Sequence, residues 1–176
     1  MSIWQAYLDD IRLSFRKQKE MAERALVQIS DDTFFKKPGE FSNSIAAIVK
    51  HVGGNFASRW TDFLTSDGEK PWRDRDAEFV TVADEGRVKV DEIWQKGWTA
   101  LFGTLDGLKE EDLLKKVRVR NEEHTVFQAI HRSLTHTSYH VGQVVYLARL
   151  LTKDDWKWLT IPPGQSKQFG KGNYLK

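Results

Sequence analysis

Apolar side chains recur every three or four residues in four long stretches of the chain, which is the spacing of one face of an α-helix. The first stretch covers residues 2–29 and the second covers residues 44–64. The third covers residues 82–105 and the fourth covers residues 126–151. The pattern therefore predicts four amphipathic helices, and helices of this length commonly bury their apolar faces against one another in a bundle.

Residues that favour helix starts stand near the beginning of each stretch. A capping box joins a Ser or Thr to a Gln or Glu three residues later, and it satisfies two backbone N–H groups. The expected caps are Ser2 with Gln5 for the first helix, Ser42 or Asn43 for the second, Thr81 with Asp84 for the third and Thr125 with Gln128 for the fourth.

Three segments break the helical pattern. Residues 31–44 contain a Pro-Gly pair and are predicted to be a connection. Residues 65–81 are polar and irregular, which indicates a long loop over one end of the bundle. In residues 115–126, Val117 and Val119 alternate with arginines before a polar turn, so we expect a small β-hairpin there.

The composition suits one globular domain. The chain has 176 residues, of which 40% are hydrophobic and 30% are charged. We therefore expect a single all-α domain over residues 1–176, with the hairpin before the fourth helix and a C-terminal tail over residues 160–176. The chain has no cysteine, which excludes disulfides, a cysteine nucleophile and cysteine-ligated zinc.

Charge and hydropathy bear on partners and location. The 27 basic and 25 acidic residues are interleaved along the chain, so we expect no nucleic-acid partner. No apolar run approaches the roughly 18 to 20 residues that span a bilayer, so we expect no membrane partner. The first residues contain acids where a signal peptide would be apolar, and we expect a cytoplasmic protein.

The fourth predicted helix carries a pair of histidines that could clamp a metal. His136 and His140 are four residues apart, so both imidazoles project from one helical face. His51 is the other histidine in a comparably strong helical pattern. A single histidine at an apolar edge is more often a buried, hydrogen-bonded side chain, but three such ligands with open positions are typical of a catalytic divalent metal.

Two other histidines do not fit this site. His131 lies about 140° around the helix from His136 at 100° per residue, so it faces elsewhere. His124 precedes the helix, where a surface or turn position is expected.

Several polar and aromatic residues could line a cavity beside the histidines. Asn55 follows His51 by one turn and Gln143 follows His140 by almost one turn, so either could orient a bound water or substrate; ordinary hydrogen bonding to a neighbouring loop is the alternative. Trp60 could form a cavity wall or simply pack in the core. Trp72 lies in a polar loop, where it could cap a pocket or meet a partner.

Glycines and arginines raise two further questions. Gly53 and Gly54 weaken a helix by about 1 kcal/mol each, which indicates close approach by a neighbouring helix or a ligand. Five arginines could bind carboxylates at a pocket mouth, or could be ordinary solvated charges. They are Arg59, Arg73, Arg75, Arg118 and Arg120.

The fourth predicted helix also contains the motif HxxxHxGQ. It is formed by His136, His140, Gly142 and Gln143, and together with His51 and the hairpin it resembles the DinB/YfiT-like superfamily of metal-dependent enzymes. Within that superfamily the chain resembles the DUF1572 group of small bacterial proteins over nearly its whole length. The resemblance implies a DinB-like four-helix bundle, usually a homodimer, in which the three histidines bind zinc, nickel or manganese.

The same resemblance suggests what the site does. Characterised relatives include S-transferases that use bacillithiol, mycothiol or glutathione, and maleylpyruvate isomerase. The leading hypothesis is therefore a metal-dependent enzyme for a small-molecule substrate, either a transferase using a low-molecular-weight thiol of the bacillithiol type or a hydrolase. The alternatives are a non-enzymatic metal-binding stress-response protein and an interaction module whose histidines are merely packed.

Overall fold

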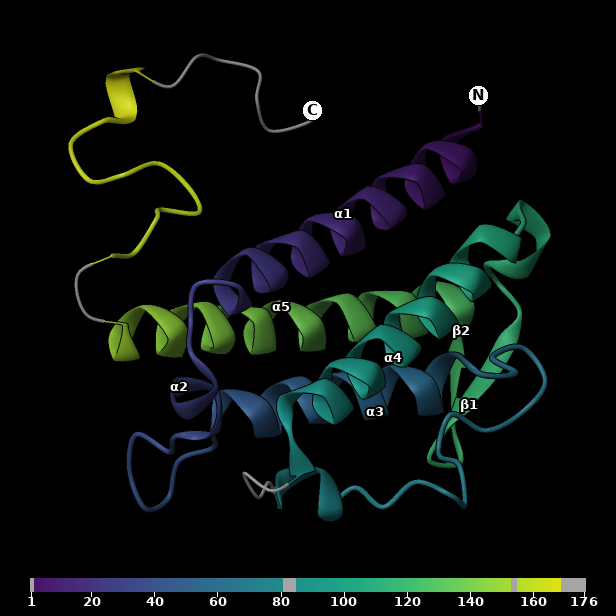
Figure 1. Ribbon diagram of the computed structural model, residues 1–176. Helices are drawn as coiled ribbons and strands as arrows, with labels where there is room; N and C mark the ends of the chain where they lie inside the picture. The colour runs from purple at the N-terminus through teal and green to yellow at the C-terminus, as the bar shows by residue number, and fades with distance from the viewer. Residues whose placement is uncertain (1, 81–84, 153–154, 169–176) are drawn as a thin grey trace.

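The computed structural model describes residues 2–80, 85–152 and 155–168. This part of the chain is 63% helical, with five α-helices and a two-stranded antiparallel hairpin before the last of them (Figure 1). The helices are α1 (Ile3–Leu26), α2 (Asp31–Phe35), α3 (Ile45–Trp60), α4 (Arg87–Gly107) and α5 (Val126–Leu151). The predicted mostly helical fold with a hairpin is confirmed, and none of the described helices is long and apolar enough to cross a lipid bilayer.

The long helices pack around an aromatic core. Helix α3 lies against α4 and α5, and α1 lies against α5 and, more lightly, against α4 (Figure 1). Phe15 of α1 meets Phe56, Trp60 and Trp98 edge to face, with ring centroids 6.1 to 6.4 Å apart. All four side chains are at most 2% exposed, so burial of their apolar surface ties three helices together.

The crossing of α3 and α4 explains one of the paired glycines. A Cβ on Gly53 would lie 2.6 Å from the carbonyl oxygen of Ile93, and a Cβ on Gly97 would overlap the backbone of Gly53. Since glycine has no Cβ, the two backbones can approach this closely. The neighbouring helix is thus what approaches Gly53.

Several helix boundaries differ from those predicted. The side chain of Ser44, and not Ser42 or Asn43, accepts the N–H of Ala47 and caps α3. This helix ends at Trp60, before a turn in which Asp62 has φ 50°. The capping box of Thr125 with Gln128 is confirmed at α5. Ser2 caps α1 by accepting the N–H of Gln5, but the Gln5 side chain donates to Asp9 and not back to Ser2. Thr81 and Asp84 lie outside the described residues.

Helix α2 was not expected. Ser30 accepts the N–H of Thr33 at its start, and Phe34 is fully buried within it. A single capped turn of five residues is too short to produce a visible helical period, so the sequence pattern predicts only a connection there.

The hairpin is fastened by the loop that follows α3. Strands β1 (Lys116–Val119) and β2 (Glu122–Thr125) are joined by Arg120 and Asn121, whose φ angles of 57° and 62° are those of a tight primed turn. The carboxylate of Asp67 accepts the backbone N–H groups of Arg120 and Asn121 at 2.9 and 2.8 Å. The polar loop therefore holds the hairpin in place, as the predicted loop over one end of the helices would.

Candidate metal centre and its cavity

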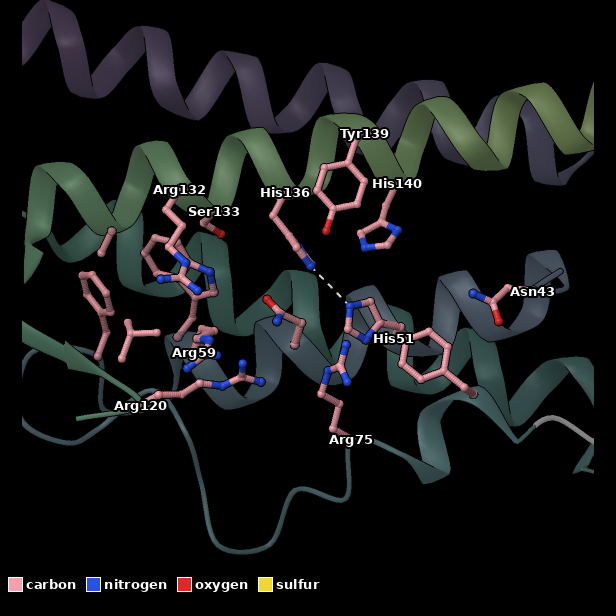
Figure 2. A pocket seen from close by; sticks show the side chains of 16 residues that line it. Asn43, His51, Arg59, Arg75, Arg120, Arg132, Ser133, His136, Tyr139 and His140 are labelled. Atoms are coloured by element: carbon pink, nitrogen blue, oxygen red, sulfur yellow. Dashed lines mark hydrogen bonds between the residues drawn. The ribbon is translucent and has the colours of Figure 1, made fainter. Parts of the chain in front are cut away.

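Three histidines from two antiparallel helices meet at one point. His51 comes from α3, and His136 and His140 come from successive turns of α5 (Figure 2). One ring nitrogen from each of the three lies within 4.8 Å of the others, and the Nε2 atoms of His51 and His136 are 3.3 Å apart. Two nitrogens bound to one tetrahedral zinc at about 2.0 to 2.1 Å are about 3.3 Å apart. The spacing fits a shared divalent ion.

A buried carboxylate orients His51. The Nδ1 of His51 lies 2.8 Å from Oε2 of Glu78, and a carboxylate only accepts hydrogen bonds. The Nδ1 atom therefore carries the proton, and the Nε2 lone pair faces the other two histidines. A carboxylate behind a histidine in this way is the usual support of a metal ligand.

Glu78 is itself held by Arg73. The Nε of Arg73 donates to Oε1 at 2.8 Å and its Nη2 donates to Oε2 at 2.9 Å, and the two side chains are 2% and 8% exposed. Burial acts to raise the pKa of Glu78, but the hydrogen bonds from His51 and Arg73 outweigh it and leave the pKa below its usual value. A Cβ on Gly54 would overlap the Glu78 carboxylate, so this glycine makes room for it.

The other two histidines are neutral at neutral pH. The Nδ1 of His140 is 2.8 Å from Oε1 of Gln143, to which it donates, and this leaves its Nε2 lone pair free. Burial, followed by the electrostatic effect of the neighbouring histidines and of Arg73 and Arg59, lowers the pKa of His136 to about 3. Burial also lowers the pKa of His140 to about 4. Neutral imidazole is the form that binds a metal.

A cavity of about 350 Å³ opens beside the histidines, between α3, α5, the hairpin and the loop over residues 61–80 (Figure 2). Its lining combines aromatic, amide, hydroxyl and guanidinium groups. Besides the three histidines it includes Asn43, Asn55, Arg59, Trp60, Phe63, Arg75, Phe79, Val119, Arg120, Ala129, Arg132, Ser133 and Tyr139. A hollow of this size with convergent polar groups suits a small molecule.

The sequence matches a family model described as "Protein of unknown function (DUF1572)" over residues 2–165. The chain belongs to the DUF1572 family. No curated protein matches the sequence. Because the family's description assigns no activity, the function of this DUF1572 protein has to be argued from its site.

The other predicted site residues have distinct places in the DUF1572 chain. Asn55 lines the cavity one turn from His51. Gln143 lies outside the lining and acts on the site by holding His140. Trp60 is both 2% exposed and part of the cavity wall, so it belongs to the core and the pocket together. Trp72 is 59% exposed and lies outside the lining.

The five arginines that could either bind carboxylates at the pocket mouth or be solvated charges divide into two groups. Arg59, Arg75 and Arg120 line the cavity. Arg73 is buried against Glu78, and Arg118 points away from the cavity toward Glu123. Arg118 lies outward because it alternates along β1 with the buried Val117 and Val119.

The two histidines excluded by helical phase lie elsewhere. The Nδ1 of His131 is 3.1 Å from the hydroxyl of Tyr7, and the two rings stack across the contact between α5 and α1. His124 lies on β2, opposite Val117. Neither residue is part of the cavity lining.

Sequence reasoning missed several residues of the site. Arg132 and Ser133 precede His136 by about one turn on the same helical face, so helical phase could have found them. Tyr139 lies between the two α5 histidines, with its ring 4.2 Å from that of His140. Glu78 belongs to a short 3-10 helix (Ala77–Phe79) within a polar loop, where no periodicity connects it with His51.

Proposed function

We propose that this DUF1572 protein is a metal-dependent enzyme for a small-molecule substrate, in which His51, His136 and His140 hold a divalent ion such as zinc, nickel or manganese. The observation that carries the proposal is the 3.3 Å separation of two Nε2 atoms whose rings are already directed at each other, one of them by Glu78. Three nitrogen ligands leave coordination positions open, as catalytic sites do.

A divalent ion in this position would lower the pKa of a coordinated thiol or water and so provide the nucleophile that a cysteine-free chain lacks. The chain's own groups would place the substrate. Burial raises the pKa of Tyr139, so its hydroxyl keeps its proton at neutral pH and can donate a hydrogen bond. The amide of Asn55 can donate or accept, and the rings of Trp60, Phe63 and Phe79 exclude water from the cavity wall.

We favour transfer of a low-molecular-weight thiol of the bacillithiol type, with hydrolysis as the alternative at the same site. The resemblance to the DinB/YfiT-like superfamily supports this choice, as it supports a single-domain DinB-like four-helix bundle and a homodimer. Sedimentation velocity tests the dimer. A non-enzymatic metal-binding stress-response protein is the competing role for the same three histidines.

Metal content tests the site itself. We expect about one divalent ion per chain in the purified protein, by elemental analysis, and loss of that ion in His51→Ala and His136→Ala. His131→Ala is the matched control, because it removes a histidine of the same helix outside the cavity. Equal metal content in all four proteins would contradict the site.

A scan of thiols and electrophiles with metal-loaded protein then tests the reaction. Turnover that requires both thiol and metal would support transfer, whereas metal-dependent cleavage of an ester or amide without thiol would replace it by hydrolysis. Metal binding without turnover, accompanied by a large loss of melting temperature on chelation, would favour the non-enzymatic role.

A further inference from the structure

The cavity has a cationic end that the histidines do not use. Among the described residues its lining contains Arg59, Arg75, Arg120 and Arg132 but no aspartate or glutamate. Three of these arginines, Arg59, Arg120 and Arg132, gather with Ser133 at the end away from His140, whereas Arg75 lies near His51 (Figure 2). We call Arg59, Arg120, Arg132 and Ser133 the arginine end.

The carboxylates near the arginine end leave it positively charged toward the cavity. Glu69 accepts from Nη2 of Arg59 at 3.3 Å and from Nε of Arg120 at 2.9 Å, so one carboxylate is shared by two guanidinium groups. Asp67 also acts on Arg59, but its oxygens are engaged by backbone N–H groups. No described carboxylate lies within ion-pair distance of Arg132, and neither Glu69 nor Asp67 lines the cavity.

Hydrogen-bond donors on residues of the cavity lining also lack acceptors. The Nη1 of Arg59, the Oγ of Ser133 and the Nε1 of Trp60 are buried and have no hydrogen-bond partner in the described part of the chain. All three residues line the cavity. Leaving a buried donor unpaired costs about 1 to 3 kcal/mol, so a ligand that brings acceptor oxygens would relieve this cost.

We propose that the arginine end binds an anionic group of the substrate, a carboxylate or a phosphate, while the rest of the substrate reaches the histidines. A guanidinium fork matches two oxygens of either group. Along the helix axes Arg132 lies about 6 Å from His136 and Arg59 about 12 Å from His51, at 1.5 Å per residue. The ligand is thus a small acid whose anion and reacting group are separated by about 6 to 12 Å. The role of the reacting group rests on the proposed function, but binding of the anion does not.

Titration calorimetry with glutarate and inorganic phosphate tests the arginine end directly. The full-length protein is measured as purified and again with chelator, so that binding to the arginines is separated from binding to a metal. We expect Arg132→Gln to weaken glutarate binding about tenfold or more, equivalent to at least about 1.4 kcal/mol. Ser133→Ala should weaken it severalfold. Both variants are expected to fold, because Arg132 is exposed and Ser133 loses only its hydroxyl.

Arg118→Gln is the matched control, since it removes an exposed guanidinium from the neighbouring strand β1 without touching the cavity. It should bind glutarate within about twofold of wild type, as surface charges away from a site have small effects. The neutral diamide of glutaric acid should bind far more weakly than glutarate. The proposal is overturned if Arg132→Gln binds glutarate as wild type does, or if the diamide binds equally well. If chelation alone abolishes glutarate binding, the anion binds at the metal centre and not at the arginine end. That result would overturn this proposal and leave the proposed function in place.

Discussion

The two ends of the cavity are built in opposite ways. At the histidine end, His51 and His140 each have a hydrogen-bond partner that turns the lone pair of Nε2 toward the centre. At the arginine end, charged and polar donors from Arg59 and Ser133 are left without acceptors. Among the three histidines only the Nδ1 of His136 is buried without a hydrogen-bond partner in the described part of the chain. The first end is therefore arranged to accept a cation, and the second offers donors to an anion.

This difference shows which side chains of the cavity are held rigidly. The Glu78–Arg73 pair behind His51 is almost fully buried, and a buried ion pair has to be fully hydrogen-bonded to be tolerated. Arg132, in contrast, is exposed and can change rotamer as a ligand arrives. Side chains that bind one small metal ion have to be held in fixed directions. An arginine that binds a larger anion can approach it in more than one rotamer.

The largest expected effect comes from breaking the support of His51. Glu78→Gln removes a buried charge and leaves Arg73 unpaired, so the free energy of unfolding should fall by about 3 kcal/mol. Metal affinity should fall by about 10- to 100-fold, as for other carboxylates behind a ligating histidine. Urea denaturation and metal titration measure the two effects.

Glu122→Gln is the control for this experiment, because Glu122 is an exposed carboxylate of the hairpin and should change stability by no more than about 0.5 kcal/mol. Glutarate binding by Glu78→Gln should stay near wild type, since Glu78 lies outside the cavity lining and makes no contact with Arg132 or Ser133. Wild-type stability and metal affinity in Glu78→Gln would mean that Glu78 does not hold His51.

The next effect should come from Gly54. A methyl group there overlaps the Glu78 carboxylate, so Gly54→Ala is expected to cost about 1 to 3 kcal/mol and to weaken metal binding. Gly103→Ala in α4 is the matched control, because nothing lies within 4 Å of its added Cβ. That control should stabilise the helix by about 0.5 to 1 kcal/mol. Thermal and urea unfolding compare the stability of the two variants. Equal changes in stability would show that the absence of a side chain at Gly54 is not needed to make room for Glu78.

The histidine end should also impose a pH dependence on the metal-free protein. The folded pKa values of His136 and His140 are lowered to about 3 and about 4, so the unfolded chain takes up protons first as the pH falls below about 6.5. Stability is therefore full above this pH and declines toward pH 4. His136→Gln should reduce the proton uptake on unfolding at pH 5 by about one, measured from urea midpoints across pH in chelator. An unchanged pH slope would contradict the neutral, buried state of His136.

The smallest effect concerns the anchor of the arginine end. Hydrogen bonds from three backbone N–H groups outweigh the opposing effect of burial and lower the pKa of Asp67, so its stabilisation is present above about pH 4 and is lost at lower pH. Asp67→Asn should cost about 1 kcal/mol at neutral pH and weaken glutarate binding by loosening the turn that carries Arg120. Glu123→Gln, on the exposed face of β2, should do neither. Urea denaturation measures the change in stability, and glutarate titration measures the change in binding. Unchanged glutarate binding would mean that Asp67 does not support the arginine end.

Much of the fold could be predicted because its signals are local. The caps at Ser2 and Thr125 and the valine alternation of β1 depend on neighbouring residues, and all three were confirmed. The predicted end of α3 was wrong because packing, which ends this helix, leaves no period in the sequence. The short α2 is missing from the prediction because a single capped turn leaves no period either. Gly53 was understood as a point of close approach, but only the structure identifies Ile93 and Gly97 as its neighbours.

The candidate site divides in the same way. Helical phase grouped His136 with His140, and the strength of the surrounding pattern singled out His51; the structure brings the three together. Their metal role stays a prediction. Glu78 could not be found, because it reaches His51 from a loop 27 residues away through a contact that no periodicity encodes. The sequence allows Arg73 a place at the pocket mouth or an ordinary solvated position, because a guanidinium in a polar loop gives no sign that it is buried.

The loop over residues 61–80 has a consequence for how this protein could be altered. It carries Glu78 to the histidines, and it carries Asp67 and Glu69 to the hairpin and its arginines. The helices contribute the reactive groups, but this one surface segment tunes both of their environments. Replacing this segment as a unit is therefore expected to change the surroundings of the histidines and of the arginines together.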